Sequence, residues 1–303
     1  MRPIRTLDEM LEHLRKSGKK KKIAVAYAQD PNTIRAIASA IKEGFVEAYM
    51  IGDKKEIITK ANKEAISSDI FNIINIPNEI EATKEAVRMV KQDECDILMK
   101  GLVGTDKFLK AVLDKEKGLL LSKTVMSYVC AIEIPKYHKL LFISDTAVLP
   151  FPDIKQKIAM VNYSVNMARK FGIEKPKVAL IGVSEKVSPN FPNSIDYAVI
   201  SKMAERGQIK NCIVDGPLDI FLACDKKSVQ IKGVKTPING DADILIFPSL
   251  EECNAFYKGL MLFCGGELAG LIQGTIKPVV VMSRSESPKS KFYCIALSCL
   301  MAK

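Results

Sequence analysis

A serine followed by an arginine, Ser283-Arg284, stands at the end of an apolar run in the C-terminal part of the chain. The run, 279–282, has the β-branched composition of a buried strand, and it follows a glycine-dense stretch, 265–274. Arginine offers a planar fork of charged donors that fits phosphate, and serine adds a hydroxyl donor. Ligands of open α/β sheets bind beyond the carboxyl ends of strands, so this pair is placed to bind an anion. The alternative is an ordinary turn with a solvated arginine.

Three other apolar runs also end in polar residues. Each such end, taken alone, is more typical of a turn or a helix cap than of a ligand site. Four polar strand ends in one chain, counting Ser283-Arg284, favour the convergence of some of them on a ligand. The three further ends are Lys100-Gly101, Ser144-Asp145 and Asp215-Gly216-Pro217.

The elements that must position these residues alternate along nearly the whole chain. Short β-branched runs followed by helical periodicity are typical of a mainly parallel sheet covered by helices, which predicts an α/β fold. The predicted strands are 22–28, 48–51, 71–76, 97–100, 140–144, 177–181, 212–215, 244–247 and 278–282. The predicted helices are 31–43, 79–92, 106–113, 154–171, 194–205 and 253–264.

Two proline-marked stretches, 134–135 and 149–152, divide the chain near its middle. Proline and its neighbours interrupt regular elements, so these stretches predict a boundary between two α/β lobes. A cleft between two lobes is a favoured place for a small-molecule site.

Composition limits the classes of partner. The 303 residues carry a formal net charge of +10, and 48% of them are hydrophobic, but no apolar run approaches the length of a membrane span. The positive charge is spread along the chain, and no nucleic-acid-binding motif accompanies it, so a polyanionic metabolite explains it better than nucleic acid does. The N-terminal segment is amphipathic, contains acidic residues and has no apolar core, unlike a signal peptide.

Cysteine and histidine usage disfavours a metal site. Eight cysteines are scattered without a CxxC pair, and only two histidines are present, so no zinc motif is formed. Several of the cysteines lie in apolar segments, as buried thiols of a cytoplasmic protein do. Walker A, GxGxxG and GxSxG patterns are also missing, which argues against nucleotide-dependent chemistry and against an α/β-hydrolase.

The chain resembles the phosphate acyltransferase family, which comprises phosphate acetyltransferases and phosphate butyryltransferases. The resemblance extends from about residue 23 to residue 297, and 185–198 together with the ending KFYCIAL is closer to the butyryltransferases. The residues that carry it are KGLVGT (100–105), SDTAV (144–148), Asp153 with Gln156-Lys157, IEKPKVAL (173–180), KMAERGQIKN (202–211), DGPL (215–218), GDADILIFPSLEECNAFYK (240–258), GELAGLIQGTIKPVVV (266–281) and SRSESPKSKFYCIAL (283–297).

The resemblance implies two α/β/α lobes flanking a cleft, similar to the isocitrate and isopropylmalate dehydrogenase fold. In that fold the C-terminal segment returns to the first lobe, which gives a first lobe of residues 1–135 plus 279–303 and a second lobe of residues 136–278. It also implies a cytoplasmic homo-oligomer, a dimer or larger, that binds neither nucleic acid nor membrane.

The implied reaction is the reversible transfer of a short acyl group, butyryl being favoured, from coenzyme A to phosphate. Coenzyme A is then a substrate or product, and no cofactor or metal is needed. Two alternatives remain: a phosphate acetyltransferase, and a non-catalytic acyl-CoA-binding protein of the same fold.

The resemblance also assigns roles to residues. Ser283 would hydrogen-bond the phosphate and Arg284 would neutralise its charge, with Thr124 and Ser127 as further candidates for the same phosphate. The residues implied to line the cleft are Lys100, Gly101, Asp145, Gln273 and Gly274.

One position departs from the family pattern. The acetyltransferase branch carries an aspartate six residues after its arginine, with a proposed role as base towards the CoA thiol, whereas position 290 here is serine. The nearest carboxylate is Glu286, two residues after Arg284. Glu286 is therefore a candidate acid or base, and the alternative is a salt-bridged cap residue beside the arginine.

Overall fold

The computed structural model describes residues 2–122, 124–282 and 286–303. Their contacts divide the chain into two compact units, each described by itself below. The first unit comprises Leu7–Met126 and Leu268–Lys303, and the second comprises Ser127–Glu267 together with the residues up to Thr6.

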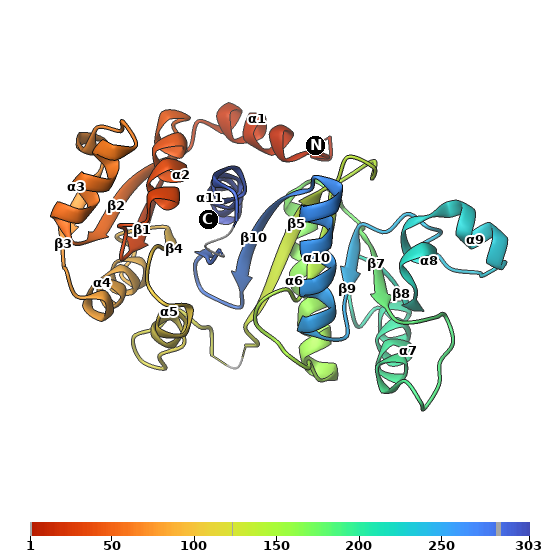
Figure 1. Cartoon of the computed structure of the whole chain (residues 1–303). Coiled ribbons are helices and arrows are strands. Elements are labelled where there is room, and N and C mark those ends of the chain that lie inside the picture. The colour runs from red at the N-terminus through yellow and green to blue at the C-terminus, as the bar shows by residue number, and fades with distance from the viewer. Residues whose placement is uncertain (1, 123, 283–285) are drawn as a thin grey trace. The chain divides into compact units, whose positions relative to one another are not determined.

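The first unit is built on a mostly parallel sheet. Figure 1 shows its N-terminal strands in red to yellow and β10, from the other end of the chain, in blue. Its strands follow the order β3 (Asn72–Asn75), β2 (Val46–Gly52), β1 (Lys21–Ala26), β4 (Ile97–Lys100), β11 (Val279–Val280) and β10 (Glu267–Gln273). Neighbouring strands are parallel, except that β10 is antiparallel to β11. The core strands β1 and β4 are buried on both faces, which explains their continuous apolar sequence.

The helices of the first unit begin at recognisable caps. Helix α2 starts at Pro31, whose fixed φ suits a first turn, and the Asp30 side chain accepts a hydrogen bond from the N–H of Thr33. Helix α11 packs against α2, although the two lie at opposite ends of the sequence. The helices are α1 (Leu7–Ser17), α2 (Pro31–Lys42), α3 (Lys54–Lys63), η1 (Ser68–Ile70), α4 (Glu79–Lys91), α5 (Thr105–Val112) and α11 (Pro288–Met301).

The second unit has the same plan. Its strands follow the order β5 (Ser127–Glu133), β6 (Leu141–Ser144), β9 (Ile244–Ile246), β7 (Lys177–Ile181) and β8 (Ile213–Leu218), and only β5 is antiparallel to its neighbour β6. Its helices are α6 (Ile154–Lys170), α7 (Pro192–Glu205), α8 (Ile220–Cys224), α9 (Lys226–Lys232) and α10 (Leu250–Cys264). The predicted α/β class is confirmed, with one antiparallel pair in each unit.

Two stretches contain strand residues that were not predicted. Most of the glycine-dense stretch 265–274 forms β10, whose apolar side chains are buried despite Gly270, and the chain passes from the second unit to the first between Glu267 and Leu268. The predicted turn at Asp215-Gly216-Pro217 is wrong, because these residues lie inside β8. Gly216 allows this close packing, since a Cβ there would lie 2.6 Å from the Cβ of Leu180, and the register of β7 and β8 shifts at the same place.

The unit boundaries differ from the predicted lobe boundaries at 135/136 and 278/279. Strand β5 pairs with β6 and so belongs to the second unit, while β10 pairs with β11 and so belongs to the first. The N–H of Ile4 bonds to the carbonyl of Phe171, which ties the N-terminal residues to the second unit. The predicted cleft between lobes stays a prediction. No helix within the described part of the chain is long and apolar enough to cross a membrane.

Candidate functional site

The carboxyl ends of β1, β4 and β11 meet at one edge of the first unit's sheet, which we call the carboxyl edge. The register aligns Ala26 with Lys100 and Val280 with Met99, so these parallel strands end side by side. The segments that leave this edge lead to Asp30, to Gly101 and to Glu286. This is the place where open α/β sheets bind ligands.

Ser283 and Arg284, the residues predicted to bind phosphate, lie outside the described residues. Their neighbours on both sides are described. Strand β11 ends at Val280 on the carboxyl edge, and Glu286 is a half-buried residue directly before Ser287, the N-cap of α11. The Ser287 hydroxyl oxygen accepts a hydrogen bond of 2.9 Å from the N–H of Ser290.

Lys100 and Gly101 lie at the carboxyl edge as predicted. The buried ammonium of Lys100 donates to the carbonyl oxygens of Val103, at 2.9 Å, and Gly101, at 3.2 Å. Gly101 packs against the turn after β1: its N–H bonds to Ala26 O at 2.9 Å, and a Cβ here would collide with the carbonyl oxygen of Tyr27. Glycine is required at this position because the β1 and β4 turns approach so closely.

An ion pair at the same edge was not predicted from the sequence. The Nζ atom of Lys291, on α11, lies 3.2 Å from Oδ2 of Asp30, and Lys291 is only 4% exposed. The same oxygen accepts the N–H of Thr33 at 2.8 Å and its hydroxyl at 2.6 Å. Burial would raise the pKa of Asp30, but the Thr33 hydroxyl and the Lys291 charge outweigh it and hold that pKa below its ordinary value.

Three predicted site residues of the first unit lie at the edge of its sheet opposite the carboxyl edge. Ile272 of β10 pairs with Val279, and the N–H of Leu98 bonds to Pro278 O, so Gln273 and Gly274 sit beside the start of β11. The register separates Gln273 from the level of Lys100 by about three residues, or ~10 Å along the strands.

Thr124 belongs to this second group. Its hydroxyl lies 2.7 Å from Leu121 O and 3.0 Å from Gly274 O, and shares one proton between these carbonyls. Gly274 has a φ of 89°, which disfavours other residues there. Gln273 is buried, and its amide nitrogen lies 3.5 Å from Leu271 O. Thr124, Gln273 and Gly274 are therefore brought together, but at a distance from Lys100 along the sheet.

Two predicted residues, Ser127 and Asp145, lie in the second unit and contact each other. The Asp145 carboxylate is 1% exposed and accepts four hydrogen bonds. Its Oδ2 accepts the Ser127 hydroxyl at 2.8 Å and the N–H of Tyr128 at 3.0 Å, and its Oδ1 accepts the N–H groups of the two residues 147 and 148 at 2.8 and 2.9 Å. Burial raises the pKa of Asp145, and these hydrogen bonds oppose the shift. The carboxylate thus joins β5 to the segment after β6.

Gln156 and Lys157, which carry part of the family resemblance, have structural partners in the second unit. Gln156 completes a capping box with Asp153 at the start of α6. The buried Lys157 donates to Asn193 and Asp196 of α7, both at 2.6 Å. These residues fasten α6 to α7.

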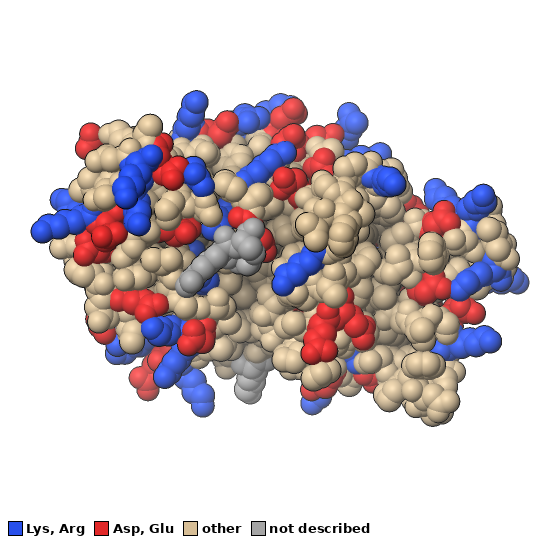
Figure 2. Space-filling view, viewed as in Figure 1, with Lys and Arg blue, Asp and Glu red and all other residues tan. Residues whose placement is uncertain are grey.

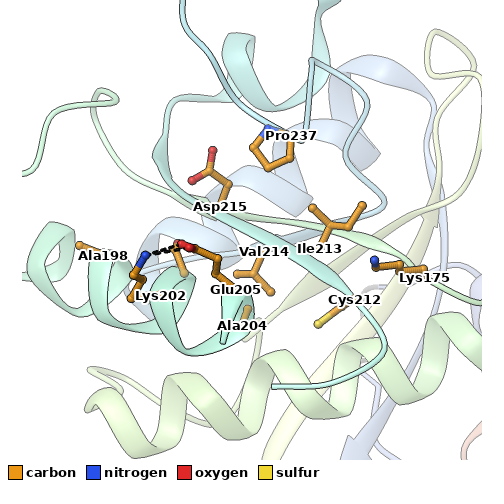
Figure 3. A pocket seen from close by; sticks show the side chains of 11 residues that line it. Lys175, Ala198, Lys202, Ala204, Glu205, Cys212, Ile213, Val214, Asp215 and Pro237 are labelled. Atoms are coloured by element: carbon orange, nitrogen blue, oxygen red, sulfur yellow. Dashed lines mark hydrogen bonds and ion pairs between the residues drawn. The ribbon is translucent and has the colours of Figure 1, made fainter. Parts of the chain in front are cut away.

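Two hollows of similar size are present, one in each unit. One, of about 470 Å³, is in the second unit between α7 and β8 (Figure 3). Its acids are engaged, since Thr236 donates to Asp215 at 2.6 Å and Glu205 pairs with Lys202 at 2.8 Å. The other, also about 470 Å³, lies between α2 and α11 in the first unit. Of the predicted polar strand ends within the described ranges, Asp215 lines the first hollow and none lines the second.

Among the described residues, neither the distribution of charge nor the arrangement of possible metal ligands indicates a further site. Positive and negative side chains are interspersed over the face seen in Figure 2, as expected from their spread along the sequence. In the described part of the chain, no three His, Cys, Asp or Glu side chains gather in a group that could hold a metal ion.

A family model described as "Phosphate acetyl/butaryl transferase" matches residues 6–85 and 77–299. The chain is also 42% identical over 299 residues to the phosphate butyryltransferase of Clostridium acetobutylicum, covering 99% of both proteins. This chain belongs to the phosphate acetyl/butyryl transferase family. It is 40% identical over 297 residues to the phosphate acetyltransferase of Thermotoga maritima, covering 98% of this chain and 99% of that protein.

Solved structures agree with membership of this family. A branched-chain phosphotransacylase from Enterococcus faecalis matches with a TM-score of 0.81 and 28% identity, covering 93% of this chain and 100% of that one. A 4-hydroxythreonine-4-phosphate dehydrogenase from Salmonella typhimurium matches with a TM-score of 0.54 and 11% identity, covering 94% of this chain and 100% of that one. The second likeness shows the fold alone, and it bears out the predicted similarity to a dehydrogenase-like fold.

Proposed function

We propose that this protein catalyses the reversible reaction of a short-chain acyl-CoA with phosphate, giving an acyl phosphate and coenzyme A. The observation that carries the proposal is the 42% identity to a phosphate butyryltransferase over 99% of both chains. The carboxyl edge of the first unit supports it, because two buried lysines, Lys100 and Lys291, lie where an α/β sheet binds anions.

The chemistry needs an anion site and a path for one proton. A phosphate oxygen attacks the thioester carbonyl, a tetrahedral oxyanion forms, and the carbon–sulfur bond breaks as coenzyme A leaves. The proton of hydrogen phosphate ends on the coenzyme A sulfur. No electron is transferred and no metal or cofactor is needed in this scheme. Holding both substrates together supplies much of the rate enhancement.

The proposed roles follow the family pattern residue by residue. Ser283 and Arg284 would hold the phosphate and stabilise the charge of the transition state. Glu286 remains a candidate for moving the proton, because position 290 is serine. The other residues proposed to bind substrate are Lys100, Gly101, Thr124, Gln273 and Gly274, whereas Asp145 and its partner Ser127 have a structural role because protein groups already fill the carboxylate.

Butyryl-CoA is the favoured substrate, with acetyl-CoA as the alternative. The relatives include both a butyryltransferase at 42% identity and an acetyltransferase at 40%, so overall identity does not separate them. One methylene changes discrimination only about 10- to 200-fold, which a few pocket side chains can set. We would assay phosphate-dependent release of coenzyme A from acetyl-, propionyl-, butyryl- and isobutyryl-CoA. Absence of release from all four would leave the non-catalytic acyl-CoA-binding alternative.

We also propose a cytoplasmic homo-oligomer. None of the eight cysteines forms a disulfide within the described residues, which suits a reducing compartment. In the second unit, helix α7 and its N-cap residue present half-exposed apolar side chains four residues apart, Phe191, Ile195 and Val199, which a second copy of the chain would cover. Light scattering coupled to size-exclusion chromatography should give at least twice the 33.5 kDa chain mass, and a single-chain mass would refute the oligomer.

A further inference from the structure

The ammonium of Lys291 is buried, but most of its hydrogen-bonding capacity is unused. A lysine side chain has three N–H donors and no acceptor. Within the described ranges, the acceptor within hydrogen-bonding distance of Lys291 Nζ is Asp30 Oδ2, at 3.2 Å. Buried polar groups are nearly always hydrogen-bonded. The remaining donors therefore point to an oxygen supplied from outside the described chain.

The position of this ammonium matches that of an anion bound at the carboxyl edge. Side chains on an α-helix lean towards its N-terminus, so Lys291 leans towards Ser287 at the start of α11. Its contact with Asp30, four residues after β1 ends, places Nζ at the carboxyl edge. The start of α11 favours negative charge, yet Pro288 has no N–H and the N–H of Ser290 is capped. The ammonium of Lys291 is thus a buried charged donor in this first turn and a half.

A purely structural role explains the ion pair less well. Asp30 already accepts two hydrogen bonds from Thr33, so it does not need Lys291 to satisfy it. The distance of 3.2 Å is also longer than the 2.7–2.9 Å typical of strong charge-assisted hydrogen bonds. A buried charge is costly unless it is well compensated, and one long contact compensates an ammonium poorly.

We propose that Lys291 is a phosphate-contacting residue: its ammonium donates to an oxygen of the phosphate that attacks the thioester, or of the acyl phosphate in the reverse direction. The proposal rests on the proposed function and adds a substrate contact to it. Lys291 acts as a hydrogen-bond donor and moves no proton in this scheme. The side chain that stabilises phosphate at the start of α11 is thus the cationic Lys291. The position directly before it, 290, is the one at which the acetyltransferase branch has an aspartate.

The test is steady-state kinetics of Lys291→Met, which keeps the length of the side chain and removes its charge. We expect the KM for phosphate to rise about tenfold or more, with the KM for the acyl-CoA within about twofold of wild type. Lys291→Arg should recover part of the phosphate affinity. The matched control is Lys289→Met on the same helix, because Lys289 is exposed and its Nζ lies 5.5 Å from the centre of the Tyr293 ring. This control should stay within about twofold of wild type in both constants.

The double variant Asp30→Asn/Lys291→Met separates substrate contact from helix fastening. If the pair only fastens α11 to α2, removing both charges should restore the kinetics relative to Lys291→Met alone. If Lys291 contacts phosphate, the double variant should keep the raised KM. An unchanged phosphate KM in Lys291→Met, or its recovery in the double variant, would overturn the proposal.

The effect of phosphate on the Tm tests the contact without any measurement of activity. Inorganic phosphate should raise the Tm of wild type and of Lys289→Met, and raise that of Lys291→Met and Lys291→Gln much less. This readout needs no turnover, so it decides the role of Lys291 even if wild type releases no coenzyme A and the proposed function fails. If Lys291→Met does not fold, the Gln and Arg variants give the same comparison. Equal Tm shifts in wild type and the Lys291 variants would contradict the contact.

Discussion

Two buried charges lie beyond strand ends in the two units, and they differ in how completely the chain satisfies them. Asp145 in the second unit accepts four hydrogen bonds from neighbouring protein groups. An ionised carboxylate has about four acceptor sites, so none is left for a ligand. Lys291 in the first unit has three donors and makes one long contact with a described residue. A saturated charge acts as an internal brace, whereas an unsaturated one is available to a substrate.

The substitution Asp145→Asn is the first test of this difference between the two buried charges. The amide nitrogen would face donors in place of an acceptor, so we expect the free energy of unfolding to fall by about 2–4 kcal/mol. Urea unfolding at pH 7, followed by circular dichroism, measures the change. Glu174→Gln, an exposed acid in the same unit, is the control and should change stability by less than about 0.5 kcal/mol. A variant as stable as wild type would show that Asp145 is no brace.

Gly101→Ala tests how tightly the carboxyl edge is packed. The added Cβ would meet the carbonyl oxygens of Tyr27 and Ala26, backbone atoms held by β1, so we expect a loss of about 2 kcal/mol in unfolding free energy. Gly259→Ala is the matched control, because a Cβ there meets nothing within 4 Å on helix α10 and should stabilise by about 0.5–1 kcal/mol. Equal melting temperatures for the two variants would contradict the close approach of the two turns.

Asp241 extends the comparison to a carboxylate whose hydrogen bonds come from lysine side chains. Burial would raise its pKa, but hydrogen bonds from Lys139 and Lys177 lower it to about 2, and His138 Nε2 lies 3.0 Å from Oδ1. Because the folded pKa is depressed, the stabilisation is present above pH ~4 and is lost as the pH falls from ~4 towards ~2.

We expect Asp241→Asn to cost about 1 kcal/mol at pH 7, since partial exposure screens the pairs, and to cost almost nothing at pH 2. Parallel urea unfolding of wild type and variant at both pH values measures this difference. The exposed Asp69→Asn serves as control. A difference that is the same at pH 7 and pH 2 would show that the ion pairs are not its source.

Much of the sheet was predictable because its strands are short, continuous apolar runs. The bounds of β4 and β7 are those predicted, since both are short apolar runs buried on two faces. Strand β10 was missed because Gly270 and Gly274 are typical of turns, and its pairing with β11 involves tertiary contacts. Helix α11 was missed because it is buried on nearly all sides, so its apolar residues show no 3.6-residue periodicity.

The site was only partly predictable, because not all of its residues follow an apolar run in the sequence. Lys100 and Gly101 directly follow an apolar run, and the carboxyl-edge rule therefore identifies them. Lys291 lacks such a signal, because lysine is usually exposed and its partner Asp30 is 261 residues away in the sequence. Gln273 ends β10 and Gly274 follows it, but β10 is antiparallel to β11, so its carboxyl end lies at the opposite edge of the sheet from the carboxyl edge.

The most direct measurement is the KM for phosphate of Lys291→Met and Asp145→Asn in the same assay, at a temperature where circular dichroism shows both to be folded. We expect that KM to rise about tenfold or more for Lys291→Met and to stay within about twofold of wild type for Asp145→Asn. A normal phosphate KM in Lys291→Met, or a rise of the same size in both variants, would contradict the difference between the two charges.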